Sequence, residues 1–192
     1  MTRSYVFRLP RKAVILFAVV LVCVLLAVLL FKPIQRRIYP MRFETIVSDA
    51  AEEYDLPPSL IYAIIYTESK FDPYAVSTAD AYGLMQITED TYRWVCQRTG
   101  QDFYMVESLY DPFTNISCGA ALICLLYERF ENTETMLAAY NAGQGKVSEW
   151  LQNPTYSQDG VTLSHIPYEE TEDYVRRVIN TQAIYQQLYN VP

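Results

Sequence analysis

Residues 59–69 form the stretch SLIYAIIYTES. Apolar residues recur in it at helical spacing, and the pattern predicts a buried helix. At about 100° per residue, Glu68 lies within about 60° of Ile61, Ile64 and Ile65 around the helix. The sequence therefore predicts a carboxyl group on the apolar face of a core helix.

The position of Glu68 favours the protonated form of its side chain. Burial among apolar groups raises the pKa of a carboxyl group, and the C-terminal end of a helix disfavours negative charge. A raised pKa is what a general acid needs near neutral pH. The same pattern also fits a glutamate that reaches solvent at the helix end, or that pairs with Lys70 or an arginine.

The rest of the chain after residue 42 is also mostly helical in pattern. Periodicity and capping residues predict helices over 43–54, 59–69, 89–99, 112–130, 133–142, 145–153 and 169–189. Asp111-Pro112 is expected to open the longest central helix, and Thr133 is expected to cap the next one. Residues 71–87 and 154–167 are expected to be loops, the second with room for a hairpin. The predicted fold class is mainly α.

Charge divides the chain into two parts. Residues 1–42 hold eight Lys/Arg and no acidic residue, whereas residues 43–192 hold seven Lys/Arg against twenty-two Asp/Glu, a net charge of −15. So acidic a domain has no electrostatic attraction for phosphates, and nucleic-acid binding is not expected. The sequence has no HExxH, CxxC or Walker motif, and its one histidine, His165, lies in a loop without a nucleophile motif. No metal site or catalytic triad is expected.

The N-terminal region carries a long apolar run. Residues 13–31 are nineteen apolar residues without a charge, and a helix of that length spans ~28 Å, close to the thickness of a bilayer core. The run ends in Phe31-Lys32-Pro33, which offers no small-residue cleavage site. We therefore expect a basic tail (1–12), an uncleaved transmembrane helix (13–31), a basic stalk (32–42) and a folded domain (43–192). Four basic residues flank each side of the span, so charge does not decide its orientation.

Three cysteines lie outside the predicted span. Cys118 and Cys124, on one helix, would be ~9 Å apart along its axis, too far for a disulfide. Any bridge therefore uses Cys96, and we expect a Cys96–Cys118 disulfide if the domain faces an oxidising compartment. Three buried thiols are the alternative.

Several short motifs follow the glutamate in a fixed order. They are Glu68-Ser69 with Phe71-Asp72-Pro73, Ala75-Val76-Ser77, Tyr82-Gly83-Leu84-Met85-Gln86, Asp111-Pro112 with Asn115-Ile116 and Gly119, Ala139-Tyr140-Asn141-Ala142-Gly143, and Ile166-Pro167-Tyr168 with Glu170-Thr171 and Tyr174-Val175. This series, over about residues 45–190, resembles the catalytic domain of soluble-lytic-transglycosylase type, a lysozyme-like helical fold that cleaves bacterial peptidoglycan.

The resemblance implies roles for individual residues. Glu68 would be the catalytic acid, and a second group would line the glycan groove: Ser77, Gln86, Tyr140, Asn141 and Glu170. The sequence departs from the family pattern at Asp80, where glycine is usual, and at Glu172, where arginine is usual. The second change removes a positive charge near the groove and could weaken a salt bridge there.

The resemblance also implies a reaction without a metal or cofactor. The acid protonates the bond between N-acetylmuramic acid and N-acetylglucosamine, and the muramyl C6 hydroxyl then attacks C1 to give a 1,6-anhydro sugar. One alternative is a hydrolytic muramidase that uses Glu68 with Asp72 or Glu170, since hydrolysis typically needs two carboxylates. Another is a non-catalytic glycan-binding assembly protein.

The implied substrate also sets the expected partners and location. Peptidoglycan strands lie outside the cytoplasmic membrane, so the catalytic domain is expected there, with the N-terminus in the cytoplasm and residues 13–31 in the bilayer. A stalk of eleven residues reaches at most ~35–40 Å, which restricts the domain to glycan near the membrane. Cell-wall or secretion machinery would be a suitable partner.

The mature protein should retain residues 13–31, because the apolar run is long and lacks a cleavage site. N-terminal sequencing of the protein extracted from membranes tests this. A mature chain that begins near residue 35–45 would contradict the prediction.

Overall fold

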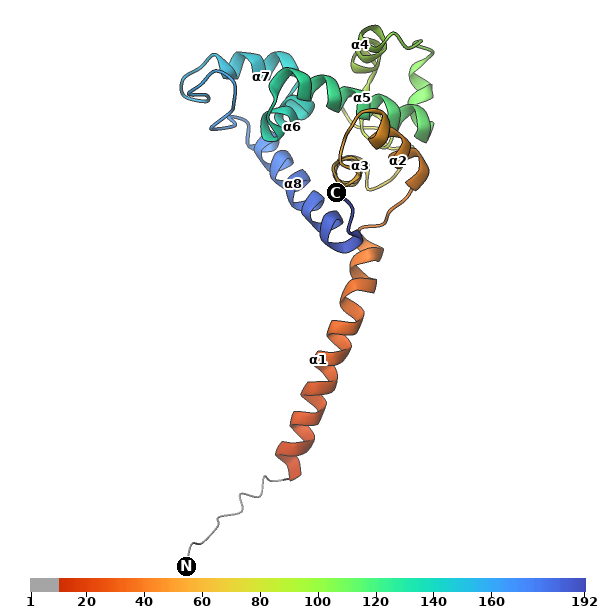
Figure 1. Cartoon of the computed structure of the whole chain (residues 1–192), viewed down its shortest axis with the longest axis vertical. Coiled ribbons are helices and arrows are strands. Elements are labelled where there is room, and N and C mark those ends of the chain that lie inside the picture. The colour runs from red at the N-terminus through yellow and green to blue at the C-terminus, as the bar shows by residue number, and fades with distance from the viewer. Residues whose placement is uncertain (1–10) are drawn as a thin grey trace, which may run out of the picture. The chain divides into compact units, whose positions relative to one another are not determined.

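The computed structural model describes residues 11–192, and the chain divides into two compact units at Pro40 and Met41. The described part of the first unit is α1 (Arg11–Ile38), one continuous helix (Figure 1). Within residues 15–38 of this helix, the most apolar 18-residue window has a mean hydropathy of 3.1 and no buried residue, so α1 has the length and composition of a membrane span. Most of the predicted basic tail, residues 1–10, lies outside the described residues.

The segment expected to be a stalk is largely helical. Helix α1 continues past Phe31 to Ile38 with Pro33 inside it, so the chain becomes non-helical only shortly before Met41. Pro33 lacks an N–H group and removes one helical hydrogen bond without ending the helix. A helix advances ~1.5 Å per residue, against ~3.4 Å for an extended chain, so this segment reaches less far than the fully extended maximum.

The second unit is mainly helical, which confirms the predicted fold class. Its elements are α2 (Glu44–Glu53), α3 (Pro58–Ser69), β1 (Ala81–Tyr82), β2 (Ile87–Thr88), α4 (Glu89–Thr99), the 3₁₀ helix η1 (Val106–Tyr110), α5 (Pro112–Phe130), α6 (Thr133–Ala142), α7 (Gln144–Leu151) and α8 (Glu169–Tyr189). The sequence pattern missed the short antiparallel pair β1–β2, in which Ala81 pairs with Thr88. Residues 154–167 form turns and bends rather than a hairpin.

Capping residues define where two of these helices begin. Asp111 accepts a hydrogen bond from the Thr114 N–H at 2.9 Å and precedes Pro112, as expected for the start of α5. The cap of α6 is Asn132, which accepts from the Thr135 N–H at 2.9 Å, and not Thr133. The prediction was one residue off because Asn and Thr are both good caps and lie side by side in the sequence.

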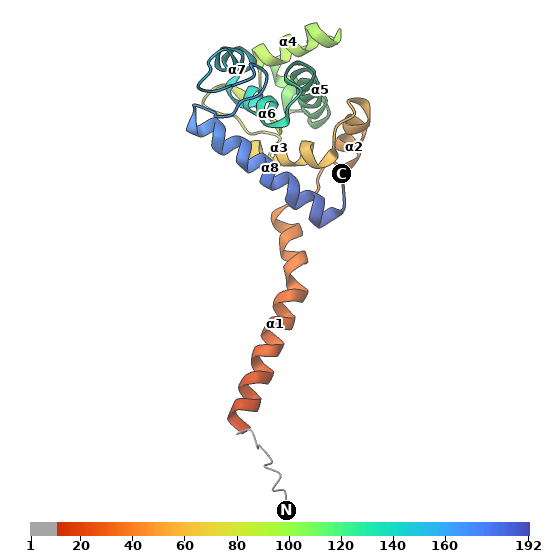
Figure 2. The same cartoon turned by 60° about the vertical axis from the view of Figure 1, so that its left-hand side comes forward.

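Helix α3 forms the centre of this unit. Its residues from Ser59 to Ile65 are all buried, and α8 packs along it (Figure 2). The rings of Tyr62 and Tyr185 stack between the two helices with centroids 5.3 Å apart. Gln182 on α8 donates a hydrogen bond to the Ser59 hydroxyl at 3.3 Å. The contacts with α8 therefore run from the start of α3 toward its last turn, where Glu68 lies.

A second buried contact joins α5 to the β1–β2 segment. The side chain of Asn115 is fully buried and completes three hydrogen bonds. Its Oδ1 accepts from the Met85 N–H at 2.8 Å, and its Nδ2 donates to the carbonyls of Tyr82 and Leu109 at 2.9 and 2.8 Å. One amide thus holds the chain between β1 and β2 and the end of η1 against α5.

Replacing Asn115 with alanine should destabilise the domain by about 2–5 kcal/mol, because three buried backbone groups would lose their partner. The Asn132→Ala substitution, which removes only the α6 cap, should cost about 1 kcal/mol. Chemical denaturation of the detergent-solubilised protein measures both. Equal losses for the two variants would contradict the central role of Asn115.

Candidate active site

Glu68 lies in the last turn of α3, at the edge of the buried core. Its side chain is half-buried, and burial raises the pKa of its carboxyl group from 4.5 to about 7. The Tyr174 hydroxyl and the positive charge of Arg177 act in the opposite direction but do not cancel the effect of burial. At neutral pH the acid and its carboxylate are therefore both populated.

The chain turns sharply after Glu68. Lys70 and Phe71 both have left-handed backbone conformations, with φ of 53° and 66°, which end α3. Such conformations cost about 1–2 kcal/mol each for residues other than glycine. The Phe71 side chain is only 1% exposed, and its burial offsets part of this cost. The turn keeps Glu68 at the helix end while the following loop starts in a new direction.

Two tyrosines stand beside Glu68. The rings of Tyr140, on α6, and Tyr174, on α8, are nearly parallel, with centroids 6.4 Å apart and planes at 7°. Burial, and then the charge of Glu68, raise the pKa of both phenols well above the ordinary value. The Tyr140 hydroxyl donates to the Met85 carbonyl at 2.8 Å. The Tyr174 hydroxyl is buried and interacts with Glu68, yet it completes no hydrogen bond of ordinary geometry.

The segment between β1 and β2 is held from three sides. Ser69 donates to the Leu84 carbonyl at 2.8 Å, Tyr140 donates to the Met85 carbonyl, and Asn115 accepts from the Met85 N–H. Gly83 has a φ of 73°, and a Cβ at this position would lie 2.3 Å from the Leu109 carbonyl oxygen, so only glycine fits. The position of this segment relative to Glu68 is therefore set by buried hydrogen bonds.

Ser77 and Gln86 belong to the same small hairpin. The Gln86 side chain donates to the carbonyls of Ala75 and Gly83, at 3.2 and 3.0 Å. The Ser77 hydroxyl accepts from the Ala79 and Ala81 N–H groups, both at 3.2 Å. Both side chains stabilise the hairpin, and both remain partly exposed.

Asn141 and Glu170 lie where α6 meets the start of α8. The Asn141 Oδ1 accepts a hydrogen bond from the Thr171 hydroxyl at 2.8 Å, which joins the residue after Tyr140 to the first turn of α8. Glu170 precedes Thr171, and its side chain is exposed. The structure gives Asn141 a positioning contact that the sequence pattern did not indicate.

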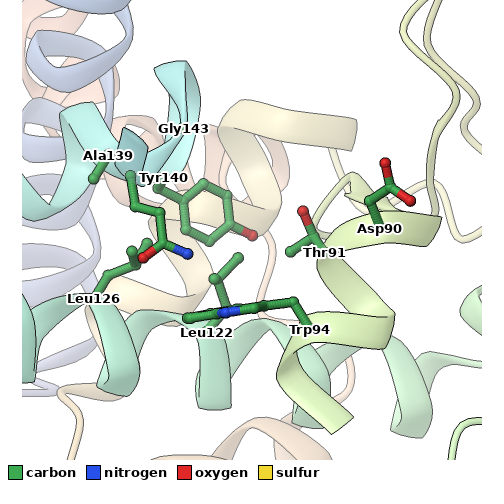
Figure 3. Close-up of a pocket in the computed structure, with 9 residues that line it drawn as sticks. Asp90, Thr91, Trp94, Leu122, Leu126, Ala139, Tyr140 and Gly143 are labelled. Atoms are coloured by element: carbon green, nitrogen blue, oxygen red, sulfur yellow. The ribbon is translucent and has the colours of Figure 1, made fainter. Parts of the chain in front are cut away.

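A pocket of about 240 Å³ opens against one side of Tyr140. Its lining residues come from four helices and are Asp90, Thr91, Trp94, Leu122, Leu126, Ala139, Tyr140, Gly143 and Gln144 (Figure 3). The Trp94 indole and the Tyr140 ring both face the pocket, and Thr91 and Asp90 lie at its α4 side. We call this the Tyr140 pocket. Flat aromatic walls with hydroxyl, amide and carboxylate groups suit a carbohydrate.

Of the residues assigned to the groove by resemblance, only Tyr140 lines this pocket. Sequence reasoning missed Asp90, Thr91 and Trp94, because their helix, α4, has an ordinary amphipathic pattern without a distinguishing motif. It named Tyr174 only as part of the last ordered motif, without a role. Nothing in the spacing of Tyr174 and Arg177 indicates that they interact with Glu68.

A family model described as "Transglycosylase SLT domain" matches residues 45–160, more than half of the chain. The chain belongs to this family.

Characterised relatives support the same assignment. The soluble lytic murein transglycosylase of Escherichia coli K12 is 32% identical over 151 residues, which is 77% of this chain and 23% of that protein. The membrane-bound lytic murein transglycosylase C of Edwardsiella ictaluri is 30% identical over 177 residues, covering 77% of this chain and 47% of the relative. This SLT-domain chain therefore matches a quarter to a half of the length of these relatives.

Solved structures have the same fold. The lytic transglycosylase Slt of Pseudomonas aeruginosa, solved as an inactive glutamate-to-glutamine mutant, has a TM-score of 0.70 and 31% identity over 80% of this chain and 25% of that chain. The 70-kDa soluble lytic transglycosylase of Escherichia coli in complex with bulgecin A has a TM-score of 0.71 and 28% identity over the same shares of the two chains. The lysozyme-like helical fold of the SLT domain is thereby confirmed.

The two departures from the family pattern have structural explanations. Asp80 has a φ of 53°, a left-handed conformation that glycine adopts freely and that aspartate tolerates better than most residues. Its N–H donates to the Ser77 carbonyl at 3.2 Å, which closes the turn. Glu172 is exposed on α8 and lines a different pocket, beside His165 and Arg176. Neither residue contacts Glu68 or the Tyr140 pocket.

The predicted disulfide between Cys96 and Cys118 is not present in this SLT domain. All four cysteines are free thiols, and both Cys96 and Cys118 are buried. The Cys96 thiol instead donates a weak hydrogen bond to the Asp102 carbonyl at 3.7 Å. Burial raises the pKa of Cys118 to about 12, as for an unreactive packed thiol.

Among the described residues, no cluster of His, Cys, Asp or Glu could hold a metal ion.

The Glu68→Gln substitution should stabilise the domain more at pH 8 than at pH 5. Because the pKa of Glu68 is about 7 in the folded domain and 4.5 in the unfolded chain, the folded state binds the proton more tightly. Folding stability therefore falls as pH rises from about 4.5 to about 7, and glutamine avoids this loss. The difference in Tm between variant and wild type should be a few degrees larger at pH 8.

The exposed Glu53, in the last turn of α2, provides the matched control, because Glu53→Gln makes the same chemical change at a solvent-exposed position. A Glu68→Gln effect of the same size at both pH values would mean that the pKa of Glu68 is not raised.

Proposed function

We propose that this SLT-domain protein is a membrane-anchored lytic transglycosylase that cleaves the β-1,4 bond between N-acetylmuramic acid and N-acetylglucosamine in peptidoglycan. The observation that carries the proposal is Glu68, a half-buried carboxyl group with a pKa of about 7. It interacts with Tyr140, whose ring also lines a pocket suited to a sugar. Tyr140 thus connects an acid that is half protonated at neutral pH with the lining of a pocket suited to a sugar.

The reaction uses one carboxyl group twice. Protonated Glu68 donates its proton to the glycosidic oxygen as the C1–O bond breaks, and the N-acetylglucosamine hydroxyl leaves. The resulting carboxylate takes the proton from the muramyl C6 hydroxyl, whose oxygen bonds to C1 and closes the 1,6-anhydro ring. Glu68 ends in its initial protonated state, and no water is consumed. An intramolecular nucleophile gains a high effective concentration, which reduces the need for a second carboxylate.

A pKa near 7 serves both halves of this cycle. A lower value would leave too little protonated acid for the first step and make the carboxylate a weaker base in the second, whereas a higher value would make the acid a weaker proton donor to the glycosidic oxygen. Burial raises the pKa of Glu68, whereas the Tyr174 hydroxyl and the charge of Arg177 lower it, and together they keep the pKa between these limits. The Tyr174 hydroxyl, which interacts with Glu68 from α8, is a positioning group for the same carboxyl.

The remaining predicted groove residues shape the site. Ser77 and Gln86 stabilise the hairpin that follows Glu68, and their partly exposed polar groups are available to sugar hydroxyls. Asn141 joins Tyr140 to the first turn of α8, where Glu170 is exposed to solvent. These contacts support roles in substrate binding for Gln86 and Tyr140, and a positioning role for Asn141.

A single-carboxylate mechanism fits better than hydrolysis. The two candidates for a second carboxylate, Asp72 and Glu170, are both exposed, and Asp72 accepts a hydrogen bond from the Tyr74 N–H at 2.9 Å. Neither shares the desolvated surroundings of Glu68. The names of the relatives favour the same chemistry, and the Pseudomonas aeruginosa relative is described as inactive after a glutamate-to-glutamine change.

The membrane topology follows from the substrate. Helix α1 has the length and composition of a span, and one group of relatives is named membrane-bound. Polymerised peptidoglycan lies outside the cytoplasmic membrane, so the domain from Met41 onward is placed there, with the N-terminus in the cytoplasm. A partly helical linker keeps the site close to the bilayer, which suits work on nascent strands or beside cell-wall or secretion machinery.

The Glu68→Gln substitution should lower turnover of purified glycan strands by a factor of ~10²–10⁴, because glutamine cannot donate the proton. Glycan binding should persist, since Gln86 and Tyr140 are unchanged. Wild-type products should be anhydromuramyl ends, ~20 mass units below hydrolysed ends after borohydride reduction, as mass spectrometry measures directly.

The control is Glu53→Gln, which changes an exposed last-turn glutamate on α2 and should leave turnover within about twofold. Reducing ends among the products would identify a hydrolytic muramidase and direct attention to Asp72 and Glu170. Undiminished cleavage by the Glu68→Gln protein would refute the assignment.

A further inference from the structure

A second pocket adjoins the Tyr140 pocket and contains two arginines. It has a volume of about 350 Å³ and is lined by Trp94, Arg98, Leu125, Glu128, Arg129 and Gln144. We call it the arginine pocket. Trp94 and Gln144 line both pockets, so the two share one wall and a ligand bound in the first lies next to the second.

The positive charge of this pocket is unusual for the domain. Residues 43–192 carry a net charge of −15 and only seven Lys/Arg, two of which line this one pocket. Three of the seven, Arg93, Lys146 and Arg176, form the ion pairs found among the described residues. Arg98 and Arg129 are in none of these pairs. Glu128 is the one acidic residue in the lining of the arginine pocket, which therefore has a net charge of +1.

Arg129 is held in place without being neutralised. Its guanidinium donates to the Gln144 Oε1 at 2.5 Å and to the Ser148 hydroxyl at 2.9 Å, both on α7. Neutral acceptors fix the orientation of the group and keep its full charge available. A pre-positioned guanidinium in a pocket that a second arginine also lines suits a carboxylate, because the planar N–H groups match its two oxygens.

We propose that the arginine pocket binds a carboxylate of the stem peptide carried by the glycan strand in the Tyr140 pocket. The inference rests on the proposed function, since it takes the occupant of the Tyr140 pocket to be peptidoglycan. A stem of four residues reaches ~13 Å from its sugar when extended, which is enough to pass the shared wall of Trp94 and Gln144. Arg98 and Arg129 thereby select strands whose peptides are present and negatively charged.

The test compares two substrates that differ only in charge. Both are glycan strands with intact tetrapeptide stems whose amino groups have been acetylated, and in one of them the carboxylates have then been converted to primary amides. Full-length wild type in detergent should cleave the carboxylate form with a kcat/KM roughly three- to tenfold higher, as expected for a charge-assisted contact made by exposed arginines. Arg98→Gln and Arg129→Gln should bring this ratio close to one.

Two further variants make the result specific. Arg93→Gln changes another exposed arginine of α4, which pairs with Glu89 outside the pocket, and it should keep the wild-type ratio. Arg98→Lys keeps the charge but loses the planar fork, so its ratio should fall between those of wild type and Arg98→Gln. Thermal melts of all variants verify folding.

Each outcome decides a different question. Equal cleavage of the two substrates by wild type, or a wild-type ratio in Arg98→Gln, would overturn the arginine pocket as a peptide site and leave the transglycosylase intact. The same loss of ratio in Arg93→Gln would also overturn it, because general surface charge would then be the cause. No anhydromuramyl product from either substrate would remove the proposed function, and this inference with it.

Discussion

The buried amide of Asn115 is the constraint on which the geometry of the site depends. It binds the backbone at Tyr82, Met85 and Leu109 through three hydrogen bonds inside the core. With the amide of Met85 fixed in this way, its carbonyl is in place to accept from Tyr140. The ring of Tyr140 then lies parallel to Tyr174, and both interact with Glu68. A contact in α5 thus determines the surroundings of a carboxyl group in α3.

The balance of forces on Glu68 explains how one carboxyl group can serve as both acid and base. Complete burial without a partner would raise its pKa so far that the carboxylate would not form, and full exposure would leave it ionised at neutral pH. At the end of α3, the Glu68 side chain lies between these two extremes of burial. The preceding turns of α3 are buried, Tyr174 and Arg177 stabilise the carboxylate, and part of the side chain still reaches the surface.

The acidic surface of the domain gives the two pockets different characters. The Tyr140 pocket presents aromatic rings and few charges, which suits neutral sugar rings. The adjoining arginine pocket concentrates positive charge that the rest of the domain lacks. A polymer with a neutral backbone and anionic branches would meet attraction at both pockets and repulsion over the acidic surface elsewhere. The placement of charge would then help to set the position at which a strand binds, as well as its affinity.

The amino-acid sequence by itself determined the helices, the apolar N-terminal segment and the anomalous position of Glu68. Each of these rests on local periodicity: an apolar repeat of 3.6 residues, an uninterrupted apolar run, or a charge on an apolar face. The start and end of α8 and the opening of α5 at Asp111-Pro112 were predictable for the same reason. The ordered motifs added the family and the candidate substrate residues.

The side chains that surround the acid are set by how the helices pack against one another. Tyr174 and Arg177 reach Glu68 because α8 packs along α3, more than a hundred residues away in the sequence, and no local pattern encodes that contact. Trp94, Arg98 and Arg129 come from α4 and α5 and meet at one pocket for the same reason. Periodicity specifies the face that a helix buries, whereas the partner of that face is set by the packing of the whole domain.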